Sequence, residues 1–200
     1  MIFEANEMYH IYNQGNNRKL IFFSRDNYLF FLKKIKLNIL PHADILAWCL
    51  MPNHFHLMVY IHTLEIYTHG VTQSHPVSKK RTLNDNIAIM LRSYTRAINK
   101  QNKNSGSLFR EATKAECISK AKGITPSFYT TYHGSEIWVA NPEKQYPQNC
   151  FNYIHTNPVE TKLVASPHDW EFSSYCDYLG LRNGKLINRK RADELGLIAS

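Results

Sequence analysis

The stretch Asp44-Ile-Leu-Ala-Trp-Cys-Leu-Met-Pro-Asn-His-Phe-His-Leu-Met-Val-Tyr-Ile-His62 decides the fold. It holds two apolar runs separated by Pro52-Asn53, a pair that favours a tight turn, so we expect two strands joined as a hairpin. Side chains alternate across a strand, which divides the second run into two faces. One face carries His54, His56, Met58, Tyr60 and His62, and the other carries the core-forming residues Phe55, Leu57, Val59 and Ile61.

The two histidines at the start of the second strand, His54 and His56, point to the same side. Their Cα atoms are about 6–7 Å apart, so both imidazoles can reach one metal ion. Two histidines do not complete a metal site, and a strand with two half-exposed histidines and no metal fits the spacing as well. A metal site therefore needs a third ligand from elsewhere in the chain.

Size and charge describe a basic globular chain. Its 200 residues are 44% hydrophobic, which predicts a single domain over residues 1–200. The net charge is +8, from 24 Lys and Arg against 16 Asp and Glu. This favours a polyanionic partner such as nucleic acid, and a basic enzyme with an ordinary charged surface stays the alternative.

The distribution of cysteines and apolar residues restricts the environment. The four cysteines form no C-x-x-C pair, so neither a zinc knuckle nor a disulfide framework is indicated. The sequence shows neither a signal pattern nor an apolar run of about 18 residues that could span a bilayer. We therefore expect a cytoplasmic protein without a membrane partner.

The order of the predicted elements indicates the fold class. We expect a strand at residues 8–12, a helix between Ser24 and Pro41, the hairpin, a helix from Thr82 to about residue 100, a bent strand at 107–118 and a helix at 147–157 ended by Pro158. This order is typical of an α+β, ferredoxin-like antiparallel sheet with helices packed on one face.

Three segments fall outside this pattern. Residues 65–81 read as an exposed, irregular basic loop, and residues 119–144 as loops with little regular structure. Residues 166–200 form an aromatic and then basic C-terminal segment that packs on the domain or extends from it.

Polar stripes mark two of the helices. Arg92, Arg96 and Lys100 lie four apart and share one helix face, which suits either a phosphate backbone or solvent. On the last helix, Asn149, Tyr153 and Asn157 share a polar face, and the neighbouring face packs inward through Cys150, Phe151 and Ile154.

Five blocks follow one another along the chain: Tyr9-His-Ile-Tyr-Asn-Gln-Gly-Asn-Asn17, Met51-Pro-Asn-His-Phe-His-Leu57, Ser105-Gly-Ser-Leu-Phe109, Tyr153-Ile-His-Thr-Asn-Pro-Val159 and Trp170-Glu-Phe-Ser-Ser-Tyr175. Together they resemble the single-tyrosine HUH transposases, in which two histidines flank a bulky apolar residue. Within that family the chain is most similar to the REP-associated tyrosine transposases.

The resemblance implies a metal-dependent enzyme of bacterial cytoplasm that works at the nucleoid. It implies cleavage and strand transfer of single-stranded, hairpin-containing DNA through a 5′-phosphotyrosine, for transposition or for host repeat processing. Tyr153 would be the nucleophile, and His54, His56 and Asn157 would bind Mg²⁺ or Mn²⁺. Imidazole ligands favour Mn²⁺ over the harder Mg²⁺.

We expect basic residues near this site to contact the DNA backbone, namely Arg18, Lys19, Arg92, Arg96 and Arg110. A homodimer is possible, since no sequence feature decides between one copy and two.

Three alternatives stay open. A replication initiator or relaxase would share the phosphotyrosine chemistry. A non-catalytic, ferredoxin-like nucleic-acid-binding module would share only the fold. A small metal-dependent phosphohydrolase would use a metal-bound water in place of Tyr153.

Overall fold

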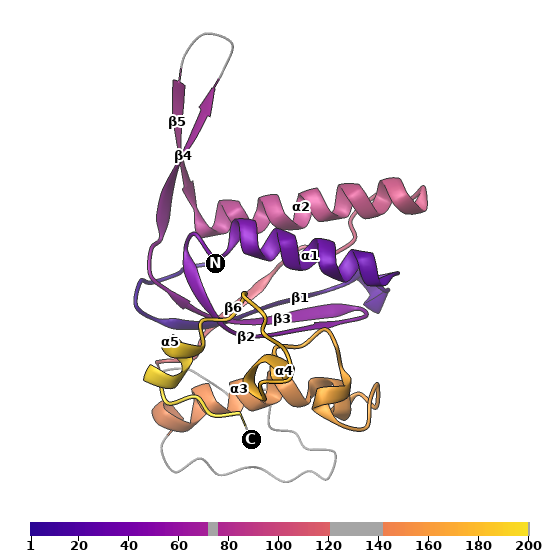
Figure 1. Ribbon diagram of the computed structural model, residues 1–200. Helices are drawn as coiled ribbons and strands as arrows, with labels where there is room; N and C mark the ends of the chain where they lie inside the picture. The colour runs from indigo at the N-terminus through magenta and orange to yellow at the C-terminus, as the bar shows by residue number, and fades with distance from the viewer. Residues whose placement is uncertain (72–75, 121–141, 200) are drawn as a thin grey trace.

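The expected hairpin forms the middle of the protein. In the computed structural model, which describes residues 1–71, 76–120 and 142–199 (Figure 1), β2 (Ala43–Met51) pairs antiparallel with β3 (His54–Ile61) across Pro52-Asn53. β1 (Met8–Gln14) pairs with β3, and β6 (Lys114–Cys117) pairs with β1, which gives an antiparallel sheet of order β2-β3-β1-β6. The expected α+β class is confirmed.

The register of β1 decides which side chains meet on the sheet. Tyr12 lies opposite His56, and His10 lies opposite both Met58 and Glu116. Directly opposed residues of an antiparallel pair point to the same side. His10, Tyr12, His56 and Glu116 therefore share one face of the sheet.

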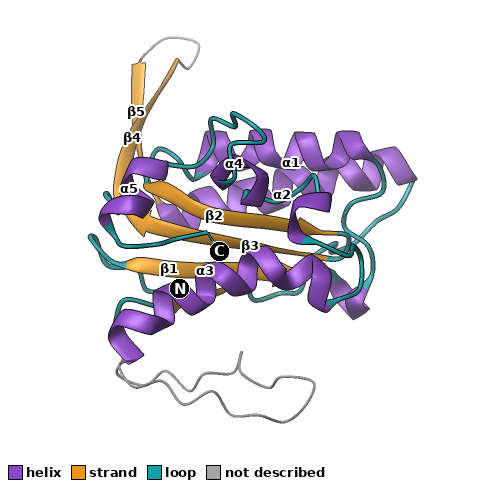
Figure 2. Ribbon diagram, turned by 60° about the horizontal axis from the view of Figure 1, so that its bottom comes forward, coloured by secondary structure: helices purple, strands orange, loops and turns teal. Residues whose placement is uncertain are grey.

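Helices cover both faces (Figures 1 and 2). The expectation that the helices share one face holds for α1 (Arg25–Asn38) and α2 (Leu83–Asn102), but it was wrong for α3 (Pro142–Glu160), which lies on the other face. The α1–α2 layer buries the odd-numbered side chains of β3, for example Phe55. α3 adds a second core on the histidine face, where Phe151 and Ile154 pack in the same cluster as Met58.

The C-terminal segment lies along the edge strand β2. Its short elements are η2 (Pro167–Asp169), α4 (Tyr175–Tyr178) and α5 (Arg189–Glu194). The Leu50 amide donates to the Phe172 carbonyl at 2.8 Å, and the Ser174 amide donates to the Trp48 carbonyl at 2.9 Å. Backbone groups at the sheet edge are thereby satisfied.

Two expectations about strands were wrong. In the range expected to be an irregular loop, β4 (Glu65–Val71) and β5 (Pro76–Thr82) pair antiparallel as a separate hairpin projecting from the body (Figure 1), and residues 72–75 lie outside the described residues. This hairpin has no apolar alternation to reveal it in the sequence; backbone pairing and an exposed Lys80–Glu65 ion pair of 2.6 Å link its strands. The strand expected at 107–118 shrinks to β6, because the Asn13 side chain donates to the Arg110 carbonyl and the Thr113 hydroxyl where a ladder would continue.

The limits of α3 also differ from expectation. The helix begins at Pro142 and ends at Glu160, so Pro158 lies inside it and does not stop it. A proline there removes one amide from the last turn, which a helix end tolerates better than its middle. The chain turns at Lys162, whose φ is 58°, and the Thr161 amide and hydroxyl both donate to the Asn157 carbonyl. Of the segment expected to be loops, residues 121–141 lie outside the described residues.

The N-terminus of α2 carries a capping box that can be tested. The Thr82 hydroxyl accepts from the Asp85 amide at 3.2 Å, and the Asp85 carboxylate accepts from the Thr82 amide at 2.9 Å. We expect Thr82→Ala to lower the free energy of unfolding by about 1 kcal/mol in urea titration. Thr95→Ala, inside the same helix, is the control and should stay within about 0.5 kcal/mol of wild type; equal effects would contradict the assignment.

Candidate active site

Four side chains singled out in the sequence converge where α3 crosses the β1–β3 face. His54 Nε2 lies 3.1 Å from the Asn157 side-chain oxygen. The ring centroids of His54 and His56 are 4.9 Å apart, and those of His56 and Tyr153 are 5.3 Å apart. The hairpin and α3, about a hundred residues apart in the chain, thus bring both histidines, the amide and the phenol into one site.

Each histidine has one ring nitrogen fixed by a neighbour. His54 Nδ1 lies 2.6 Å from the Asn53 side-chain oxygen, which directs its Nε2 toward Asn157. His56 Nδ1 lies 2.9 Å from His10 Nε2. His56 Nε2 is buried and has no hydrogen-bond partner among the described residues. Burial lowers the pKa of both His54 and His56, which favours the neutral form of the ring that metal ligation requires.

These residues fit a divalent cation. Ligand atoms at about 2.1 Å from one ion and at right angles to each other are about 3 Å apart, close to the 3.1 Å between His54 Nε2 and the Asn157 oxygen. The unpaired nitrogen of His56 would supply a further ligand. Within the described residues, no group of three or more His, Cys, Asp or Glu is arranged to hold a metal, so a site here would need the Asn157 amide.

The phenol of Tyr153 is difficult to ionise in its surroundings. Burial, followed by the negative charge of Glu160, raises its pKa to about 12, and a hydrogen bond with Asn157 opposes this rise only in part. Tyr153 is therefore protonated near neutral pH, and any reaction that uses it as a nucleophile must first remove its proton.

Three further residues of the site were not identified from the sequence. His10 and Tyr12 stack with ring centroids 4.8 Å apart, and the Tyr12 hydroxyl donates to a Glu116 carboxylate oxygen at 2.6 Å. Burial and then this hydrogen bond raise the pKa of Tyr12. The alternation of β1 places His10 and Tyr12 on one face, but the sequence could not show that β3 and β6 lie on either side of them.

A cavity of about 430 Å³ opens beside these side chains; its lining includes His54, His56, Tyr153 and Lys114. A larger groove of about 700 Å³ runs between α2 and residues 106–113. Arg110 and Asn13 line both, so the two spaces adjoin.

The basic residues expected to contact DNA divide into two groups. Arg92, Arg96 and Arg110 line the larger groove together and bring three positive charges to it. Arg18, the last residue of the short 3-10 helix η1 (Asn16–Arg18), and Lys19 are exposed and line neither space. The Asn53 side-chain amide donates to the Arg18 carbonyl at 3.4 Å, so this stretch still borders the residue before His54.

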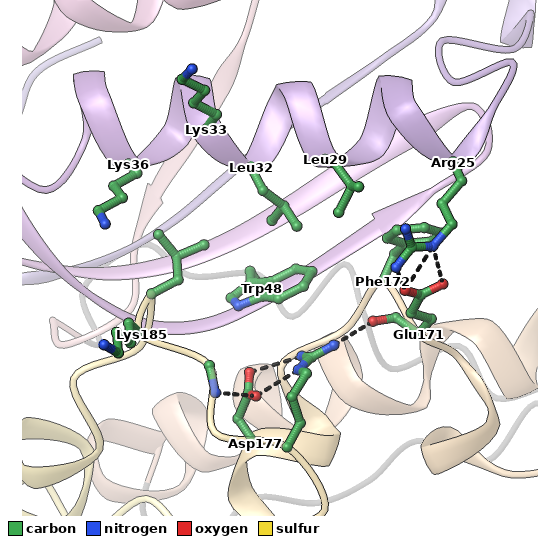
Figure 3. A pocket seen from close by; sticks show the side chains of 13 residues that line it. Arg25, Leu29, Leu32, Lys33, Lys36, Trp48, Glu171, Phe172, Asp177 and Lys185 are labelled. Atoms are coloured by element: carbon green, nitrogen blue, oxygen red, sulfur yellow. Dashed lines mark hydrogen bonds and ion pairs between the residues drawn. The ribbon is translucent and has the colours of Figure 1, made fainter.

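A further cavity of about 420 Å³ lies at the far edge of the sheet, between α1 and the C-terminal segment (Figure 3). Its lining contains two ion pairs. The exposed pair joins Arg25 to Glu171, and the other joins Arg182 to the buried carboxylate of Asp177. The pair of Arg182 and Asp177 ties the segment 171–184 together, because Arg182 also donates to the carbonyls of Glu171 and Ser173. The Arg182 guanidinium lies over the Trp48 ring of β2, 5.3 Å from its centroid.

No family model matches the chain, and no curated protein matches it. One solved structure does, that of a REP-associated tyrosine transposase bound to a REP hairpin. The match covers 90% of this chain and 83% of that chain, with a TM-score of 0.53 and 14% sequence identity. The chain thus has the fold of a tyrosine transposase, and the expected resemblance is confirmed at the level of the fold. No helix in the described ranges is both long and apolar enough to cross a membrane.

Proposed function

We propose that the protein cleaves and rejoins single-stranded DNA, with Tyr153 as the nucleophile. The observation that carries this proposal is the convergence of Tyr153 and Asn157 with His54 and His56 beside a groove lined by arginines. A structural module for binding nucleic acid needs the groove, but it has no need of a phenol beside two neutral imidazoles.

The chemistry follows from the positions of these groups. Arg110, Arg92 and Arg96 hold the phosphates of the strand in the groove, which leaves one phosphate beside Tyr153. The Tyr153 oxygen, having lost its proton to solvent, forms a bond to phosphorus as the bond to the 3′ oxygen breaks. The released 3′ oxygen takes up a proton, and the 5′ phosphate stays on Tyr153. A second 3′-hydroxyl can reverse this step and join a new strand without ATP.

The ion itself would have a single role. Held by His54, His56 and Asn157, it would neutralise the negative charge that develops on the phosphate oxygens. Single-stranded DNA with a hairpin is the proposed substrate, since the solved structure of the same fold is bound to a REP hairpin.

The decisive experiment uses the full chain, single-stranded hairpin DNA from the sequence flanking its gene, and Mn²⁺, followed on a denaturing gel. We expect a protein–DNA band that survives denaturation and disappears with EDTA. Cleavage without this band would indicate a water nucleophile and contradict the role of Tyr153. Binding without cleavage and without the covalent band, across a panel of hairpins, would indicate a non-catalytic binding module.

The choice of metal gives a second prediction. Two imidazole ligands suit Mn²⁺ better than Mg²⁺, which prefers oxygen. We expect single-turnover cleavage to be at least several-fold faster in Mn²⁺ than in Mg²⁺ at equal concentration. Equal or faster cleavage in Mg²⁺ would argue against histidine ligation in the active complex.

The pH dependence gives a third prediction. Tyr153 has a pKa of about 12 in the metal-free site, so the reactive phenolate fraction rises about tenfold per pH unit below that value. Burial lowers the pKa of His54 and of His56, so these rings lose their protons at lower pH than free histidine and do not oppose the rise. Cleavage should therefore increase steadily from pH 6.5 to 9. A plateau that begins near pH 7 would show that the metal-loaded phenol ionises much more easily.

A further inference from the structure

We propose that His10 is a positioning residue that holds His56 in the tautomer and orientation needed to bind a divalent cation. The inference rests on the proposed function and extends it to a residue outside the cavity. His10 is fully buried on β1, and its Nε2 lies 2.9 Å from His56 Nδ1. It does not line the cavity beside Tyr153, so it would act through His56 and not on the substrate.

The hydrogen bond between the two rings couples their tautomers, that is, which nitrogen of each ring carries the hydrogen. Between two neutral imidazoles, one nitrogen must donate and the other must accept. If His56 donates, its Nδ1 carries the hydrogen, and its Nε2 keeps a lone pair that can ligate a metal. If His10 donates, His56 Nε2 carries a hydrogen and cannot ligate.

A divalent cation in the adjoining cavity favours the first arrangement. His56 Nε2 is buried without a hydrogen-bond partner in the described part of the chain, so no other described group competes for its lone pair. A lone pair at the same place can be satisfied by a cation in the adjoining cavity. His10 therefore serves as the acceptor that leaves this lone pair available.

Packing fixes the donor and acceptor in place. The rings of His10 and His56 are 5.1 Å apart and nearly parallel, at 24°. The Tyr12 ring also stacks on the His10 ring, with centroids 4.8 Å apart, and the Tyr153 ring contacts the His10 ring edge-on, with centroids 6.2 Å apart. With its ring held by these neighbours, His10 determines the direction in which His56 Nε2 points.

Two variants separate the loss of the hydrogen-bond acceptor from the loss of side-chain volume. His10→Leu introduces an apolar side chain of similar size and removes the acceptor, whereas His10→Gln offers an amide oxygen as a new acceptor. We expect Mn²⁺ affinity of the full chain, measured by electron paramagnetic resonance, to fall about 10–100-fold in His10→Leu. His10→Gln should recover most of that loss, and thermal unfolding checks that both variants are folded.

A second measurement reads the tautomer without any metal. In the histidine ¹⁵N spectrum of the apo protein, we expect His56 to carry its hydrogen on Nδ1 in wild type and to lose this preference in His10→Leu. Protonation of His56 at Nε2 in wild type would overturn the inference, as would unchanged Mn²⁺ affinity in His10→Leu. Absence of the covalent DNA adduct in wild type would instead refute the proposed function, since the tautomer does not depend on it.

Discussion

Replacing Tyr153 by phenylalanine should abolish the covalent protein–DNA adduct and lower cleavage by at least ~10⁴-fold, because the attacking oxygen is then missing. DNA binding should change less than about threefold, since the arginines of the groove remain. Stability should also change little, because the ring contacts with His56 and His10 persist without the hydroxyl. The adduct is scored on a denaturing gel and binding by fluorescence anisotropy.

Tyr60→Phe is the matched control for this substitution. Tyr60 lies on β3 on the same face as His56, outside the cavity, and its hydroxyl lies 3.3 Å from the Asn6 side-chain oxygen. This variant should form the adduct at the wild-type rate. An adduct that persists in Tyr153→Phe would show that another tyrosine is the nucleophile, and Tyr12 would then be the first to examine, since it lines the same cavity.

Asp177→Ala should cause the largest loss of stability, about 3 kcal/mol in the free energy of unfolding. The Asp177 carboxylate accepts from Arg182 Nε at 2.6 Å, from Arg182 Nη2 at 2.8 Å and from the Gly184 amide at 3.1 Å. Asp177 is only 6% exposed, so its removal leaves a partly buried guanidinium without its counter-charge. Urea denaturation of the full chain measures the change.

Glu171→Ala tests whether the large loss of stability expected for Asp177→Ala is due to the burial of that carboxylate. Glu171 pairs with Arg25 at 2.5 Å on the rim of the same cavity (Figure 3), but both side chains are at least half exposed. We expect a loss below about 1 kcal/mol, the usual range for an exposed pair. Comparable losses in the two variants would show that the attachment of the C-terminal segment does not depend on the buried carboxylate.

The arrangement of the hairpin follows from local sequence. Alternation of apolar and polar residues from His54 to Ile61 separates the two faces of β3, and in the structure its odd positions fill the core under α1 and α2. The capping residue Thr82 and the spacing of apolar residues likewise fix the start of α2 and its buried face. These features depend on neighbours within a few positions, which the sequence displays directly.

The β4–β5 hairpin and the extent of α3 were not predictable in the same way. None of the hairpin side chains that the structure describes, at residues 65–68 and 78–82, is buried, and the sequence shows no apolar alternation there. Pro158, which normally marks a helix end, is accommodated one turn before the chain reverses at Lys162. In the hairpin, backbone hydrogen bonding between strands outweighs the intrinsic secondary-structure propensity of the residues; in α3, a reversal of the chain after Pro158 does so.

For the site, the sequence by itself supplied four candidates, His54, His56, Tyr153 and Asn157. The spacing of the two histidines and the helical spacing of Tyr153 and Asn157 brought them to notice, and the resemblance to the tyrosine transposases suggested their roles. Only the tertiary structure decided their neighbours. His10 reaches His56 because β1 pairs with β3, and Glu116 reaches Tyr12 because β6 pairs with β1. Neighbouring strands are joined by backbone hydrogen bonds, and side-chain periodicity does not show which strands pair. The residues that orient the site can therefore be identified only from the assembled sheet.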